Sequence, residues 1–308
     1  MAGPANEVDG LGRCQGGKGL EFLQPTSLTE ALELKAAHPG AVPLAGGTDL
    51  MVDLNFDRLR PEAMLDLTRI DELKQWWPHD DLIRLGAGVS YTRLVSEIGE
   101  YLPGLAIASR TIGSPQIRNR ATVGGNLGTS SPAGDALPPL LAARAEIEVA
   151  SAGSTRRMPF RDFMIGPKKN ALAPEELIVA VHIPKARGPQ QFSKIGTRNA
   201  MVISVASFAL AIDAGTRAIS SAIGSAGPVI LEAPEADEFI ESSLEESGAW
   251  DARSPIDDSV LQRFGELVAQ GARPISDVRG TKAYRQHALA VIAARTLTWA
   301  WDDYMASA

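Results

Sequence analysis

The sequence predicts an α+β protein of two domains that meet near residue 188. Short apolar runs of strand length alternate along the chain with capped or amphipathic segments of helix length. Residues 21–45 have the order strand, helix, strand, which is typical of a small βαβ unit. The composition changes at residues 185–191, KARGPQQ, as expected for a linker, and 308 residues suffice for two domains.

The N-terminal elements follow from local signals. Residues 1–20 are Gly-rich and polar, without the apolar segment of a secretory signal, and are predicted to form a flexible tail. A strand is expected over Glu21–Leu23. Ser27 and Glu30 form a capping-box pattern, which places a helix start there and its end near residue 39. Residues 41–45 are the next predicted strand.

The middle of the chain continues this alternation up to residue 183. A glycine-rich segment at 121–134 interrupts it and is interpreted as a loop between two apolar segments. The predicted strands are 64–67, 82–85, 146–150 and 177–183. One helix is predicted to start near residue 92, and two more are predicted over 101–113 and 135–143.

The region after residue 188 is predicted to hold two strands and two helices. The strands span 201–212 and 218–226. Ser254 followed by Pro255 is typical of a helix start, and that helix is expected to run to Gly271. Apolar residues at helical spacing from Tyr284 onward predict an amphipathic C-terminal helix.

Composition excludes several classes of protein. Cys14 is the single cysteine, so this chain alone cannot form an internal disulfide, a four-cysteine zinc site or an iron–sulfur cluster. The four histidines lie far apart, and no metal site is predicted. A net charge of −7 without a basic stripe argues against nucleic acid as a partner. No apolar run reaches the roughly 20 residues of a membrane span, so a cytoplasmic protein is expected.

Two glycine patterns match phosphate-binding motifs incompletely. Residues 12–19 resemble a P-loop, but Gly19 stands where Ser or Thr would hold magnesium, and no strand precedes them. Gly86 and Gly88 follow a predicted strand, but Tyr91 occupies the position of the third glycine of a dinucleotide fingerprint. We interpret residues 86–91 as a strand-to-helix turn.

Two other segments are stronger candidates for a nucleotide site. Leu44–Asp49 places two glycines and Thr48 at the end of a buried strand. The segment is compatible with a tight turn and equally with a phosphate site. Thr122–Asp135 combines four glycines, hydroxyl groups and a carboxylate, as contact with a diphosphate and a ribose requires. Lys194 and Arg198, four residues apart, are by spacing alone an ordinary solvated pair of charges.

Several segments in the same order resemble the FAD-binding medium subunit of the molybdenum hydroxylases, the xanthine dehydrogenase and carbon monoxide dehydrogenase family. The resemblance covers residues 21–304. The segments that carry it are LAGGTD at 44–49, QIRNRATVGGN at 116–126, SPAGD at 131–135, LAPEE at 172–176, FSKIGTRNAM at 192–201 and DVRG at 277–280.

The resemblance implies a fold of two parts. Residues 21–187 would form an FAD-binding domain of the vanillyl-alcohol oxidase (PCMH) type, with lobes of about 21–75 and 76–187. Residues 188–308 would form a smaller α+β domain of the molybdenum hydroxylase flavoprotein type.

It also implies which residues contact FAD. Lys194 matches a lysine near the flavin ring, where its charge would stabilise the reduced N1–C2=O edge. Ile112 stands where xanthine oxidase relatives carry an aromatic residue that stacks on adenine. The implied cofactor-binding residues are Pro43, Leu44, Ala45, Gly46, Gly47, Thr48, Asp49, Leu50, Ile112, Thr122, Val123, Gly124, Gly125, Asn126, Thr129, Asp135, Ile178 and Lys194.

The implied function is electron transfer within a larger enzyme. FAD on this chain would receive electrons from two 2Fe-2S clusters on a small subunit, while molybdopterin on a large subunit hydroxylates the substrate. The acceptor would be NAD or another oxidant, and the assembly a dimer of heterotrimers. The motifs favour the xanthine (purine) branch. Carbon monoxide, nicotine, caffeine and aldehyde enzymes are alternatives, as is a stand-alone FAD-dependent oxidase.

Overall fold

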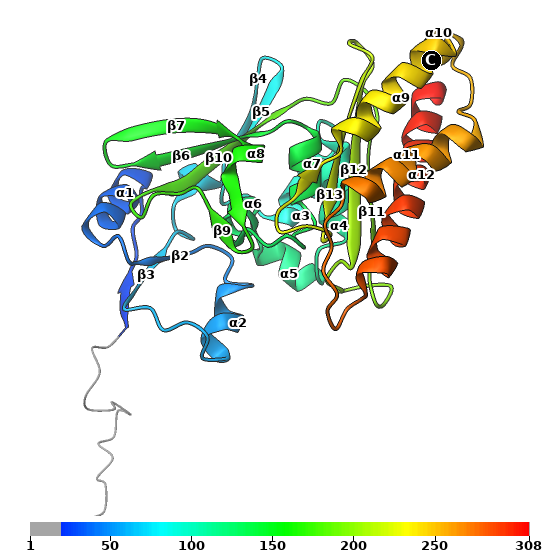
Figure 1. Cartoon of the computed structure of the whole chain (residues 1–308). Coiled ribbons are helices and arrows are strands. Elements are labelled where there is room, and N and C mark those ends of the chain that lie inside the picture. Colours follow the sequence, from blue (N-terminus) through cyan, green and yellow to red (C-terminus); the bar gives the residue numbers. More distant parts are fainter. Residues whose placement is uncertain (1–19, 308) are drawn as a thin grey trace, which may run out of the picture.

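The computed structural model describes residues 20–307, so the predicted tail and the P-loop-like residues 12–19 lie outside the described part. The first lobe holds a three-stranded parallel sheet in the order β1-β3-β2 (Figure 1). Its elements are β1 (Glu21–Leu23), α1 (Leu28–Ala37), β2 (Val42–Leu44), α2 (Leu50–Asn55) and β3 (Ala63–Asp66).

The predicted cap of α1 is confirmed with one change in detail. The Ser27 hydroxyl accepts a hydrogen bond from the Glu30 backbone N–H. The Glu30 carboxylate accepts from the N–H of Thr26, at 2.8 Å, rather than from that of Ser27. In contrast, α2 buries none of its residues and stands away from the sheet on a loop (Figure 1).

The second lobe is a five-stranded antiparallel sheet in the order β4-β5-β10-β6-β7, with short helices packed against it. The strands are β4 (Trp76–His79), β5 (Leu82–Gly86), β6 (Glu146–Ser151), β7 (Ser154–Pro159) and β10 (Leu177–Pro184), and β8 (Met164–Gly166) pairs with β9 (Lys169–Asn170). The helices are α3 (Tyr91–Arg93), α4 (Pro103–Arg110), α5 (Pro115–Arg120), α6 (Val123–Thr129), α7 (Leu137–Ala142) and α8 (Phe160–Phe163), with a 3-10 helix at Asp71–Lys74 and a π-helical turn at Leu94–Ile98.

The C-terminal region is a four-stranded antiparallel sheet in the order β11-β12-β13-β14. Helices α9, α11 and α12 cover one face of this sheet, and α7 of the preceding lobe packs on it from the other side (Figure 1). The elements are β11 (Gln190–Ile195), β12 (Ala206–Asp213), β13 (Ala218–Gly224), β14 (Leu231–Glu232), α9 (Pro234–Glu246), α10 (Ala249–Ala252), α11 (Asp258–Gly271) and α12 (Lys282–Ala306).

The hydrophobic core is divided into three clusters. One lies in the first lobe and reaches Leu177 and Val179 of β10, and one lies between the C-terminal sheet and its helices. The largest lies under the five-stranded sheet and includes Phe192 and Ala209 from beyond residue 188. The apolar core of the second lobe therefore includes side chains from both sides of residue 188. The domain boundary near this residue remains a prediction.

The α+β fold is confirmed, but three predicted elements are wrong in part. Helix α11 starts at Asp258 rather than at Ser254, whose carbonyl oxygen instead accepts a hydrogen bond from the Trp301 indole. Strand β12 starts at Ala206, because residues 201–204 form a loop. Residues 123–129 of the expected glycine-rich loop are helix α6, which Thr122 caps. Within residues 20–307 no helix is long and apolar enough to cross a membrane.

Candidate functional site: a cavity lined by two glycine segments

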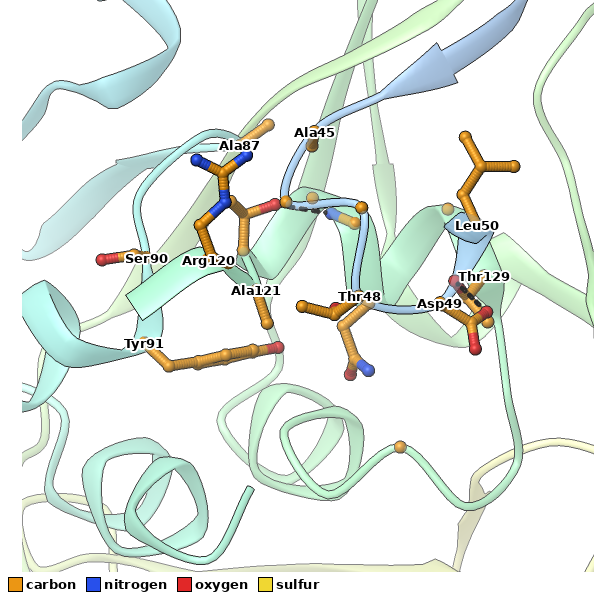
Figure 2. A pocket seen from close by; sticks show the side chains of 18 of the residues that line it. Ala45, Thr48, Asp49, Leu50, Ala87, Ser90, Tyr91, Arg120, Ala121 and Thr129 are labelled. Carbon is orange, nitrogen blue, oxygen red and sulfur yellow. Dashed lines mark hydrogen bonds between the residues drawn. The ribbon is translucent and has the colours of Figure 1, made fainter. Parts of the chain in front are cut away.

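A cavity of about 910 Å³ is bordered by all three parts of the fold. Its walls come from the loop after β2, the turn after β5, helices α5 and α6, strand β10 and the loop at 201–203. Figure 2 shows the first three of these walls, with Ala45 and Thr48 after β2, Ala87 and Tyr91 after β5, and Arg120 at the end of α5. This volume lies in the range of sites that take a large organic ligand. The turn at 86–91, interpreted as a strand-to-helix connection, contributes Ala87, Gly88 and Tyr91 to the wall.

The first glycine segment lies against the backbone of the second lobe. A Cβ atom on Gly46 would stand 1.9 Å from the Arg120 carbonyl oxygen, so only glycine permits this approach. Gly47 has a positive φ of 73°. The N–H groups of residues 46–49 donate no hydrogen bond to the described part of the chain. Four adjacent N–H groups beside a cavity are suitable donors for phosphate oxygens.

The second glycine segment has the opposite property. Thr122 Oγ1 accepts from the Gly125 N–H at 3.0 Å, and the Ala87 carbonyl oxygen accepts from the Gly124 N–H at 2.9 Å. A Cβ atom on Gly124 would lie 2.6 Å from the Ala87 Cβ. These glycines therefore allow α6 to pack closely on the turn after β5, and their N–H groups are already used by the protein.

A side-chain hydrogen bond connects the two segments at the edge of the cavity. The Thr129 hydroxyl, at the end of α6, donates to Asp49 Oδ2 at 3.0 Å (Figure 2). Asp49 immediately precedes α2, and its side chain does not cap that helix. Its carboxylate therefore stands next to the unpaired N–H groups of the first segment.

Asp135, which lines the cavity, forms a buried ion pair with Lys194. Lys194 Nζ donates to Asp135 Oδ2 at 2.6 Å, and the Ser204 hydroxyl donates to Asp135 Oδ1. Burial raises the pKa of the Asp135 carboxyl group, and the charge of Lys194 opposes this rise. Lys194 is thus not part of a solvated pair with Arg198, whose guanidinium instead donates to the Met201 carbonyl oxygen.

Most of the predicted site residues surround this one cavity. Leu44, Val123 and Lys194 do not line it: Val123 is fully buried and Lys194 donates to Asp135, whereas Leu44 is the one residue of β2 that does not reach the cavity. The predicted residues that line the cavity are Pro43, Ala45, Gly46, Gly47, Thr48, Asp49, Leu50, Ile112, Thr122, Gly124, Gly125, Asn126, Thr129, Asp135 and Ile178.

The sequence did not indicate several other wall residues. Met201, Val202 and Ile203 line the cavity, although their apolar side chains made this segment look like the start of a strand. Tyr91 also lines it, and its hydroxyl oxygen is buried without a hydrogen-bond partner in the described structure, as is the side-chain oxygen of the predicted site residue Asn126. Unsatisfied polar atoms are expected near a site that binds a polar ligand. No group of three or more potential metal ligands exists among residues 20–307.

The two lobes, the shared cavity and the sheet beyond residue 188 define an α+β protein with a site for a large organic ligand. Quinoline 2-oxidoreductase from Pseudomonas putida 86 has a similar fold, with a TM-score of 0.85 at 23% identity over 93% of this chain and 98% of its own. Carbon monoxide dehydrogenase from Hydrogenophaga pseudoflava gives a TM-score of 0.81 at 24% identity, over 92% and 98%.

Two families match consecutive parts of the chain. Residues 18–186 match the FAD binding domain in molybdopterin dehydrogenase, and residues 191–300 match the CO dehydrogenase flavoprotein C-terminal domain. The chain therefore belongs to the family of FAD-binding subunits of the molybdenum hydroxylases.

Curated relatives agree with this assignment. The xanthine dehydrogenase FAD-binding subunit of Escherichia coli O157:H7 is 29% identical over 290 residues, which cover 90% of this chain and 94% of the relative. The nicotinate dehydrogenase FAD-subunit of Eubacterium barkeri is 34% identical over 210 residues, 64% of this chain and 71% of the relative. The nicotine 6-hydroxylase medium subunit of Paenarthrobacter nicotinovorans is 27% identical over 283 residues, 90% and 96%.

Proposed function

We propose that FAD occupies the cavity with its diphosphate at the N–H groups of residues 46–49. These unpaired donors are the observation that carries the proposal, since they belong to residues that line a cavity of about 910 Å³ and the described protein does not use them. The unpartnered side-chain oxygen of Asn126, which also lines the cavity, supports the presence of a polar ligand. The remaining cavity-lining residues predicted from the sequence are proposed to contact the same cofactor.

The proposed function is electron transfer inside a larger enzyme. Bound FAD supplies the ability to accept electrons singly and to release them as a pair. The chain binds and orients the cofactor, and its own side chains do not hydroxylate a substrate. Because this chain has a single cysteine, it cannot hold iron–sulfur clusters alone, and we place them on a small partner subunit. We further propose molybdopterin on a large subunit and a cytoplasmic assembly that is a dimer of heterotrimers.

For the substrate, we propose the xanthine (purine) branch and NAD as the acceptor. The Escherichia coli relative named for xanthine supports this, but nicotinate and nicotine enzymes match at similar identity. Purification of the native complex with metal and flavin analysis, followed by turnover assays with xanthine, carbon monoxide, nicotine and aldehydes, would identify the branch. A complex that turns over only one of the other substrates contradicts the xanthine proposal.

The cofactor proposal is tested first on the purified chain. We expect the apo-chain to bind FAD at one equivalent, with quenching of flavin fluorescence, and to require partner subunits for substrate oxidation. Absence of FAD binding by the folded chain contradicts the proposal. Rapid oxidation of a small alcohol or amine by the chain alone indicates the stand-alone oxidase instead.

A further inference from the structure

The side chain of Lys194 has no hydrogen left for a ligand. It extends from β11, and 12% of its side chain is exposed. Its ammonium group donates to Asp135 Oδ2 at 2.6 Å, to the Thr111 carbonyl oxygen at 3.1 Å and to the Val202 carbonyl oxygen at 3.3 Å. An ammonium group has three donors, and all three are directed at the protein.

The partners of Lys194 belong to different parts of the cavity wall. Asp135 lines the cavity at the end of the second glycine-rich segment, and Val202 lines it from the loop beyond residue 188. Ser204, on that same loop, donates to the second oxygen of Asp135. One buried carboxylate therefore holds both β11 and the 201–204 loop against the second lobe.

The charge of Lys194 favours the ionised form of this carboxylate. Asp135 is 8% exposed, and the burial that raises its pKa would favour the neutral form if the charge of Lys194 were removed. A neutral Asp135 would hold the loop with weaker hydrogen bonds, because bonds to charged groups are the stronger class.

We propose that Lys194 is a positioning residue that holds Asp135 and the loop of Met201–Ile203 as preformed walls of the cofactor cavity, and that it does not touch the flavin. This inference rests on the proposed function, since it concerns the affinity of the same cavity for FAD. It differs from the role that the family resemblance implies for Lys194, where the ammonium group lies beside the flavin ring.

The test compares K194M, S204A, D135N and the double variant K194M/D135N in the full chain. We expect K194M to weaken FAD binding about 10-fold or more, and S204A to weaken it by a smaller factor in the same direction. The double variant should bind no more weakly than the weaker single variant, because both substitutions break the same pair. The reduction potential of FAD bound to K194M should equal that of the wild type. K282M, which replaces an exposed lysine of α12, is the matched control.

Three results would overturn the inference. The first is wild-type FAD affinity in folded K194M and S204A. The second is a loss of FAD binding free energy in K194M/D135N that equals the sum of the losses in the two single variants. The third is a lowered reduction potential in K194M, which indicates direct contact with the flavin. If K194M fails to fold, S204A and D135N still provide the affinity test. Failure of the wild-type chain to bind FAD would instead contradict the proposed function itself.

Discussion

The two Gly-Gly pairs of the cavity, Gly46-Gly47 and Gly124-Gly125, have the same sequence and different roles. In the first segment the N–H groups of residues 46–49 have no acceptor in the described protein, and they border the cavity. In the second, the N–H groups of both glycines donate to Ala87 and Thr122. The first pair therefore offers donors to a ligand, whereas the second lets a helix pack against a turn.

The difference originates in what surrounds each pair. Gly46-Gly47 follows a strand and precedes helix α2, and although Gly46 packs against the Arg120 backbone, its N–H group donates to no acceptor in the described structure. Gly124-Gly125 lies in the first turn of α6, where Thr122 and the carbonyl oxygens after β5 provide acceptors. A glycine-rich motif thus indicates a phosphate site only where its N–H groups stay unpaired.

The largest expected effect is at the contact between the lobes. In G46A the added Cβ would lie 1.9 Å from the Arg120 carbonyl oxygen, a backbone atom that cannot move alone. We expect destabilisation by about 3 kcal/mol, a fall in Tm of roughly 6–12 °C, and loss of FAD binding. Thermal unfolding followed by flavin titration would measure both. G153A is the control, since its Cβ meets nothing within 4 Å. A stable G46A chain that retains FAD would disprove the close approach.

The second expected effect distinguishes the roles of Gly124 and Gly125, of which the first packs against the protein and the second borders the cavity. G124A places a Cβ 2.6 Å from the Ala87 Cβ and should cost about 2 kcal/mol of stability. At Gly125 a Cβ meets only Thr122 Oγ1, at 3.1 Å, so G125V should be less destabilised, while its side chain obstructs the cavity and weakens FAD binding strongly. Unfolding curves and FAD titrations of both variants test this. Equal loss of stability would remove the distinction.

A smaller effect is expected at the cap of α6. T122A removes the oxygen that accepts from the Gly125 N–H, and loss of such a cap costs about 1 kcal/mol. We expect a Tm lower by roughly 2–4 °C. T122S retains the hydroxyl and should behave like the wild type in the same calorimetric experiment. An unchanged Tm in T122A would show that the cap contributes nothing to the second segment.

The smallest expected effect concerns charge near the first segment. The Asp49 carboxylate lies next to the proposed diphosphate donors, and D49N retains an acceptor for the Thr129 hydroxyl while removing the negative charge. We expect FAD to bind a few-fold more tightly at low salt, with a smaller gain at about 0.5 M salt because of screening. FAD titrations at both salt concentrations provide the measurement. Weaker binding in D49N would indicate that the carboxylate accepts a hydrogen bond from the ligand.

Much of the fold could be predicted because its signals are local. The Ser27 cap, the apolar runs of β3, β5 and β10 and the helical spacing after Tyr284 each specify an element within a few residues. Residues of both glycine segments line one cavity, and their contact with FAD stays a prediction. Their composition could not show which N–H groups would find acceptors, because Ala87 is distant in sequence from Gly124.

The structural features that could not be predicted from the sequence either depend on residues distant in the chain or have no periodic apolar pattern. β11 alternates polar and apolar residues weakly, since Ser193 and Lys194 have polar partners on other elements. Thr111 and Asp135, which bind Lys194, lie 83 and 59 residues away in the chain. No local pattern can indicate such a contact. Helix α2 has no buried face and therefore no amphipathic signal.

That property of α2 has a kinetic consequence. Because none of its six residues is buried, its opening exposes no apolar core and requires little free energy. Its amide hydrogens should therefore exchange with solvent much faster than those of β3 in the same lobe, all of whose residues are buried. The proposed diphosphate donors immediately precede α2, so we expect local opening there to loosen their hold on the cofactor while the three-stranded and five-stranded sheets stay folded.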